Sequence, residues 1–95
     1  MILGKVVGTV VNAQQNFSIS GPRFLLIDKC NPKGERKGDY IVALDLVSAG
    51  YDELVMISES SSARQTPLTN NKPVDAIIVG IIDVIDENET IVYRK

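Results

Sequence analysis

Histidine and tryptophan are absent from this 95-residue chain, and Cys30 is its only cysteine. Without histidine, the chain lacks the commonest general acid–base group and the commonest metal ligand. One cysteine cannot make up a zinc site of the usual ligand count. It also excludes an internal disulfide, which fits a cytoplasmic protein. These absences argue against an enzyme, and we expect neither a metal nor a cofactor.

Basic charge and long apolar runs are also scarce. The net charge is −2, whereas nucleic-acid-binding proteins usually carry a basic surplus that displaces counterions from phosphates. No apolar run approaches the length needed to cross a bilayer, and residues 1–5 lack the features of a secretory signal. The 44% of hydrophobic and 23% of charged residues are ordinary for a folded domain. We expect one domain over residues 1–95, with no nucleic-acid or membrane partner.

Short apolar runs separated by stretches with glycine, proline and charged residues predict strands joined by turns. The expected strands are residues 2–11, 24–28, 40–47, 53–58 and 74–85, with a short last strand at 90–93. Residues 30–39 are expected to form a hairpin loop and 86–89 a turn. A single helical turn is expected at 59–64, because serines cap helix starts. Five main strands with almost no helix predict an all-β fold, a small closed five-stranded barrel.

The predicted strands are apolar on both faces, whereas a barrel strand facing water should alternate between apolar and polar residues. The opposed sets are Val55 and Ile57 against Leu54 and Met56; Ile41 and Ala43 against Val42, Leu44 and Leu46; and Ile77, Val79 and Ile81 against Ile78 and Ile82. Identical subunits are the simplest cover for the outer face, and long loops folded back over it are the alternative. In the first strand, Gly4 and Gly8 are four apart and are expected to share a face.

Candidate catalytic groups are few. Asp45, Asp75 and Asp83 lie in or beside strands, but nothing in the sequence pairs them for acid–base chemistry. Ser60, Ser61 and Ser62 with Arg64 would suit an anion, but a serine nucleophile lacks its usual base. Helix capping or contact between subunits is the favoured interpretation of the serines. Turn contacts or salt bridges between subunits are the favoured interpretation of the aspartates.

A cluster of basic residues gives the alternative function. Lys29, Lys33, Arg36 and Lys37 lie in or beside the second predicted loop, and a basic loop on a small barrel is typical of proteins that bind single-stranded nucleic acid. Base stacking needs aromatic side chains, which this chain has in small number. A solvated hairpin tip is favoured, and the nucleic-acid-binding barrel remains the alternative.

Three stretches together resemble the vertex-protein family of bacterial microcompartments, of the EutN/CcmL type. They are residues 1–11; residues 42–50 continuing through Glu53 and Val55 to Ser61-Ser62-Ala63-Arg64; and residues 73–83. The resemblance implies a barrel similar to an oligonucleotide-binding (OB) fold that assembles into a cyclic ring. The ring would be a pentamer at the vertices of a polyhedral shell, with hexameric shell proteins as partners. It further implies subunit contacts at Ala49, Gly50, Ser61, Ser62, Ala63 and Arg64.

Two positions depart from this family's usual pattern. Asp52 and Ser60 stand where the family usually has glycine. Aspartate is among the non-glycine residues that best tolerate a positive φ, so we expect the turn at Asp52 to form. Changes near a ring axis would alter a pore or the subunit number, so a hexamer remains an alternative to the pentamer.

Overall fold

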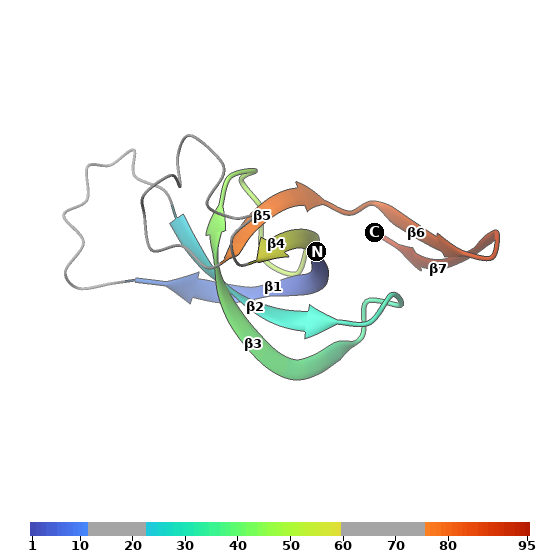
Figure 1. Cartoon of the computed structure of the whole chain (residues 1–95), viewed down its shortest axis with the longest axis horizontal. Helices are drawn as coiled ribbons and strands as arrows, with labels where there is room; N and C mark the ends of the chain where they lie inside the picture. Colours follow the sequence, from blue (N-terminus) through green and yellow to red (C-terminus); the bar gives the residue numbers. More distant parts are fainter. Residues whose placement is uncertain (12–22, 60–75) are drawn as a thin grey trace.

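A closed barrel of five strands forms the body of the protein in a computed structural model that describes residues 1–11, 23–59 and 76–95 (Figure 1). The strands are β1 (Ile2–Val10), β2 (Arg23–Cys30), β3 (Arg36–Asp45), β4 (Leu54–Glu59) and β5 (Ala76–Ile81). They close in the order β1-β2-β3-β5-β4, because β1 pairs with both β2 and β4. All neighbours are antiparallel except β3 and β5, which are parallel. The predicted five-stranded OB-like barrel is confirmed, while the helical turn expected at 59–64 lies almost wholly outside the described residues.

A hairpin of two short strands follows the barrel. It consists of β6 (Val84–Glu87) and β7 (Thr90–Arg94), and it projects beyond one end of the barrel (Figure 1). The expectation of one long strand over 74–85 was therefore wrong. The N–H of Ile82 donates the last bond to the barrel, to the carbonyl of Leu54 at 2.8 Å. Asp83, a poor strand residue, then separates β5 from β6.

The loop expected at 30–39 is shorter than predicted. Strand β2 continues to Cys30 and β3 begins at Arg36, so only residues 31–35 connect them. The side chain of Asn31 organises this turn by accepting bonds from the N–H groups of Lys33 and Glu35, at 2.9 and 3.0 Å. Charged residues extend both strands here because Asp28 and Arg36 form an ion pair across the hairpin.

The barrel interior holds one apolar core. Its buried members come from all five strands and the loop before β4: Val6, Leu25, Ile27, Ala43, Ala49, Val55, Ile57, Ala76 and Ile78. Leu44 and Ile77 lie in a second, smaller buried cluster with Phe24 and Leu46 packed against it. Strands β3 and β5 are therefore apolar on both faces, as predicted.

Two irregularities in strand pairing place side chains on the opposite face from the one that strict alternation predicts. Between β4 and β5 the register shifts after Met56, so that Ile81 pairs with Val55 and packs on the same core as Ile78. The expectation that Ile81 shares a face with Ile77 was wrong, because one extra residue reverses the side-chain direction.

The second irregularity lies in β1, where the register shifts between Val6 and Gly8. A Cβ on Gly4 would lie 2.3 Å from Cγ2 of the core residue Ile27, whereas one on Gly8 would meet Leu26 at 3.8 Å. The expectation that the two glycines share a face was therefore wrong, and only Gly4 permits a close approach of strands.

Candidate assembly interface

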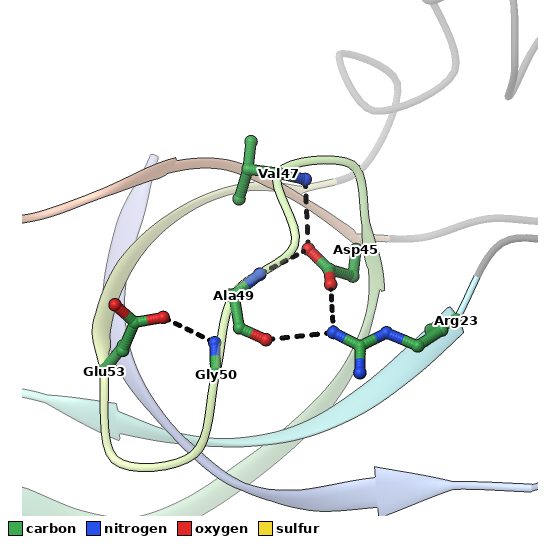
Figure 2. A network of polar contacts seen from close by, with 6 residues as sticks. All are labelled: Arg23, Asp45, Val47, Ala49, Gly50 and Glu53. Carbon is green, nitrogen blue, oxygen red and sulfur yellow. Dashed lines mark hydrogen bonds and ion pairs between the residues drawn. The ribbon is translucent and has the colours of Figure 1, made fainter.

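The loop at residues 46–53, which joins β3 to β4, is fixed to the barrel by a buried carboxylate. Asp45 ends β3, and its Oδ1 accepts hydrogen bonds from the N–H groups of Val47 and Ala49 at 3.0 and 3.2 Å (Figure 2). Its Oδ2 accepts a bond of 2.7 Å from Nη2 of Arg23, which also donates to the carbonyl of Ala49 at 3.0 Å. Aspartate commonly accepts such bonds from the backbone just after it in a turn. The first half of the loop is thus held in one conformation.

The second half of the 46–53 loop is held by Glu53. Its Oε1 accepts a bond from the N–H of Gly50, and its Oε2 pairs with Nζ of Lys95 at 2.5 Å. The backbone of β1 contributes as well, because Val6 exchanges bonds with Asp52 and Glu53 at 2.8 and 3.0 Å. One carboxylate therefore joins this loop to the end of the β6–β7 hairpin.

Electrostatics favour the ionised form of both carboxylates. Burial alone would raise the pKa of Asp45, but the bonds from Arg23, Val47 and Ala49 outweigh burial and hold the pKa below its ordinary value. The bond from Lys95, assisted by the N–H of Gly50, lowers the pKa of Glu53. Both carboxylates accept hydrogen bonds that hold the loop. This structural role accounts for the presence of Asp45 at the end of a strand.

The backbone of this loop takes a conformation that most residues avoid. Ser48 has φ of 58° and Asp52 has φ of 68°. The turn expected at Asp52 does form with the aspartate in the left-handed region, which this residue type tolerates better than most. A loop with a fixed backbone and an exposed tyrosine at its tip, Tyr51, is the kind of surface that interfaces use, because the backbone is ordered before contact and tyrosine is enriched in interfaces.

The predicted contact residues fall into two groups. The side chain of Ala49 is buried in the barrel core, while Gly50 is exposed beside Tyr51. A neighbour would therefore contact the outer surface of the loop rather than the methyl group of Ala49. Ser61, Ser62, Ala63 and Arg64 lie outside the described residues, as do Ser60 and Asp75, so the contact expected there stays a prediction.

The outer surface of the barrel contains exposed apolar side chains. Tyr40 and Val42 of β3 and Val79 of β5 are exposed, and β3 lies beside β5, with Leu44 paired to Ile77. Tyr40 and Val42 are alternate residues of one strand, so they share the outer face of β3, and neighbouring exposed apolar side chains of this kind are typical of interaction sites.

Half of the basic cluster beside the β2–β3 turn is already paired. Nε of Arg36 donates to the buried Asp28 at 2.7 Å, and this bond lowers the pKa of the aspartate. Lys29 lies 3.8 Å from Asp39 and 3.7 Å from Glu59. Only Lys33 and Lys37 of the four cations lack a carboxylate partner within the described part of the chain.

Cys30 is a buried thiol, and the acidic residues of the described ranges do not gather into a metal-type cluster. The thiol of Cys30 is buried, donates to the carbonyl of Asp28 at 3.4 Å, and has a pKa raised by that burial. Within residues 1–11, 23–59 and 76–95, no three His, Cys, Asp or Glu side chains gather as a metal site. The same ranges contain no helix of a length and apolarity that would cross a membrane.

The turn contact predicted for Asp45 is confirmed by its bonds from Val47 and Ala49, but the distant partners Arg23 and Lys95 were not predicted. Asp45 carried a local signal, because an aspartate three residues before Ser48-Ala49-Gly50 can accept from the turn that follows it. Arg23 and Lys95 carried none, since they meet Asp45 and Glu53 only after the barrel has closed.

These features define a class of small OB-like barrel that presents a fixed loop and an apolar outer surface. A protein-family model described as "Ethanolamine utilisation protein EutN/carboxysome" matches residues 1–83. The chain belongs to this EutN/CcmL family.

Three relatives show how far the similarity extends. The chain is 41% identical over 95 residues to the carboxysome shell vertex protein CcmL of Gloeobacter violaceus, covering 100% of this chain and 95% of the relative. A solved structure of Gloeobacter violaceus CcmL has a TM-score of 0.90 and covers 100% of this chain and 98% of that one. The shell vertex protein EutN of Escherichia coli K12 is 30% identical over 95 residues, with 100% of both chains covered.

The third relative is the microcompartment shell vertex protein GrpN of Rhodospirillum rubrum. It is 41% identical over 86 residues, covering 90% of this chain and 97% of the relative. Its solved structure, described as a pentameric microcompartment shell protein, has a TM-score of 0.78 at 40% identity and covers 92% of this chain and 99% of that one.

Proposed function

We propose that this protein is a structural subunit of a bacterial microcompartment shell, located in the cytoplasm, that forms pentamers at the vertices of the shell. The observation that carries the proposal is similarity along nearly the whole chain to proteins named shell vertex proteins, one of them pentameric in its solved structure. The role is structural rather than catalytic, and it needs no cofactor.

The fold suits this role physically. A flat layer of six-fold units cannot close into a polyhedron, and five-fold units supply the missing curvature. A cyclic ring brings two different patches of each subunit together in a head-to-tail contact. We propose the 46–53 loop and the outer face of β3, with its exposed Tyr40 and Val42, as two such patches. Hexameric shell proteins are the partners we propose for the outside of the ring.

Within the ring, we place the subunit contacts at the 46–53 loop and at residues 61–64. Asp45, Arg23 and Glu53 order the loop before any neighbour arrives, so association loses little loop entropy. Gly50 and Tyr51 are the exposed part of the loop, and Ala49 supports them from the core. Ser61, Ser62, Ala63 and Arg64 complete the proposed contact.

Native mass spectrometry of the purified protein tests the proposal by counting subunits. Five copies are expected. Six would leave a ring but remove the vertex role, and a monomer at all concentrations would overturn the proposal. Imaging of a deletion strain adds a second test, since closed, regular compartments in a strain with no second vertex protein would contradict the role.

A pair of substitutions tests the placement of the contact. Tyr51→Ala removes an exposed side chain from the loop, and Val11→Ala removes one that is equally exposed, at 77% against 76%. The first is expected to lower the fraction of pentamer at low micromolar concentration and the second to leave it unchanged. Equal behaviour of the two variants would move the contact away from the loop.

A further inference from the structure

The β6–β7 hairpin has one face on the barrel and one face turned away from it. Ile85 pairs with Tyr93, so their side chains share a face. Tyr93 packs on the β2–β3 turn, where a Cβ on Gly34 would lie 2.7 Å from its Cδ2. This contact fixes which face of the hairpin meets the protein's own barrel.

The opposite face of the hairpin is exposed and carries two apolar side chains, Val84 and Ile91, opposite the charged Arg94 and Asp86. Val84 and Asp86 alternate with Ile85, and Asp86 pairs with Ile91, so Val84 and Ile91 lie on the face away from Tyr93. Both apolar side chains are 48% exposed. A two-stranded hairpin is marginally stable by itself, and this one projects from the barrel (Figure 1). An additional contact on its outer face would both cover these side chains and stabilise the hairpin.

Charge indicates what makes that contact. The end of the hairpin carries Asp86, Glu87 and Glu89, all exposed. The complementary charge lies on the same chain, at Lys33 of the β2–β3 turn and Lys37 at the start of β3, both exposed. Among the described residues, no ion pair joins the two groups within one chain. A second copy would bring the acidic end to the basic pair.

We propose that the β6–β7 hairpin is an arm that docks on a second copy of this chain, placing its acidic end against that copy's Lys33 and Lys37 and covering Val84 and Ile91. The inference rests on the ring proposed above, because a head-to-tail ring lets every subunit both offer an arm and receive one. Opposite charges would set the orientation of the contact, and the apolar pair would exclude water from it.

Charge reversal and charge exchange test the arm. Reversal of the arm end by Asp86→Lys with Glu87→Lys and Glu89→Lys, and reversal of the basic pair by Lys33→Glu with Lys37→Glu, are each expected to raise the concentration at which rings dissociate by roughly fivefold or more, because like charges then face each other. Combining all five substitutions restores opposite charges and is expected to return dissociation to within about twofold of the original. The measurement is sedimentation velocity across a dilution series, with circular dichroism to show that each variant is folded.

The apolar part of the arm has its own variant and control. Val84→Thr with Ile91→Thr keeps the branched shape and the strand propensity, so the monomer is expected to fold while its rings dissociate more readily. Val11→Thr, at a side chain 77% exposed, is expected to change nothing.

The outcomes separate this inference from the proposed function. If rings of five dissociate at the same concentration in all these variants, or if the charge exchange does not restore assembly, the proposed docking of the arm is wrong. Either result would leave the proposed vertex role unaffected. A protein that is monomeric before any substitution would overturn both.

Discussion

The barrel and the β6–β7 hairpin are both antiparallel β-structure for the most part, but they are held in place differently. Every barrel strand has two neighbours, and the interior between them is a buried apolar core. Each hairpin strand has one neighbour. The hairpin meets the barrel through the packing of Tyr93 on Gly34 and the ion pair of Lys95 with Glu53.

This difference has a consequence for stability. Residues that share one core unfold together, whereas a segment with few buried contacts opens locally at a lower free energy. The barrel is therefore a scaffold that keeps its shape alone, while the hairpin is a feature whose order depends on ties to other elements. Substitutions in the barrel should change global unfolding, and substitutions in the hairpin should change local opening.

The largest effect is expected from Asp45→Ala in the barrel. The change leaves the N–H groups of Val47 and Ala49 and the guanidinium of Arg23 without their acceptor. Unsatisfied groups of this kind cost about 1–3 kcal/mol. Because the side chain of Arg23 is partly exposed to water, we expect a loss of about 2 kcal/mol. Chemical denaturation at one protein concentration measures it. Asp39→Ala, which breaks only a surface ion pair of 3.8 Å, is the control and should cost less than about 0.5 kcal/mol.

The pH dependence of the unfolding free energy gives a second test of the role of Asp45. Because the folded pKa of Asp45 lies below its ordinary value of 3.8, its contribution is present above that value and is lost as the pH falls through the folded pKa. Asp45→Asn keeps an acceptor without the charge, so its unfolding free energy should depend less on pH below about 4. An equal acid dependence in both proteins would show that Asp45 is not responsible.

The next effect is expected from Gly4→Ala, also in the barrel. The new methyl group would lie 2.3 Å from Cγ2 of Ile27 and 3.3 Å from the carbonyl oxygen of Asp28. Overpacking of a core costs about 1–3 kcal/mol. Gly8→Ala is the matched control, since its nearest neighbour is at 3.8 Å, and it should be neutral or slightly stabilising. Equal losses for the two variants would contradict the bulge in β1.

These two glycines also show how far the sequence alone could predict the fold. Alternation in β3 and β4 correctly placed Ile41 on one face with Ala43, and Val55 on one face with Ile57, because the side-chain period of a strand is a local property. It did not say which face is the core, and the structure places both pairs there. A bulge depends on how two strands fit, so it left no signal near Gly8 or Ile81.

The candidate interface was predictable to a smaller extent. The turn at Ala49 and Gly50 followed from local residue types and from the resemblance to the family. The ties of Asp45 to Arg23 and of Glu53 to Lys95 join residues 22 and 42 positions apart, and they become visible only once the strand order is known.

A smaller effect is expected where the two regions meet, at Gly34. Gly34 and Gly38 both have positive φ, of 81° and 72°, so alanine strains the backbone at either position. Only Gly34 has Tyr93 against it; nothing lies within 4 Å of a Cβ on Gly38. Gly34→Ala should therefore cost about 1 kcal/mol more than Gly38→Ala. Amide exchange in β6 and β7 should also become faster in the first variant only.

Removal of the ring of Tyr93 isolates this contact. With Tyr93→Ala in both proteins, the difference between the Gly34 and Gly38 variants should vanish, as a double-mutant cycle requires for a single shared contact. A difference that persists would place the cost in the β2–β3 turn and would remove the main tie between barrel and hairpin.

The smallest effect is expected at the hairpin turn itself. Asn88 and Glu89 have φ of 51° and 66°, the signs that a two-residue hairpin turn with both central residues left-handed requires. Asparagine suits this conformation, but glutamate does not, and glycine is favoured at the second position. Glu89→Gly should stabilise the hairpin by about 0.5 kcal/mol and slow amide exchange in β6 and β7 roughly twofold. Asn88→Gly, the control, should change little. Because the hairpin opens without the barrel, the global unfolding midpoint should stay the same, and a midpoint that rises with Glu89→Gly would mean that the two regions unfold as one unit.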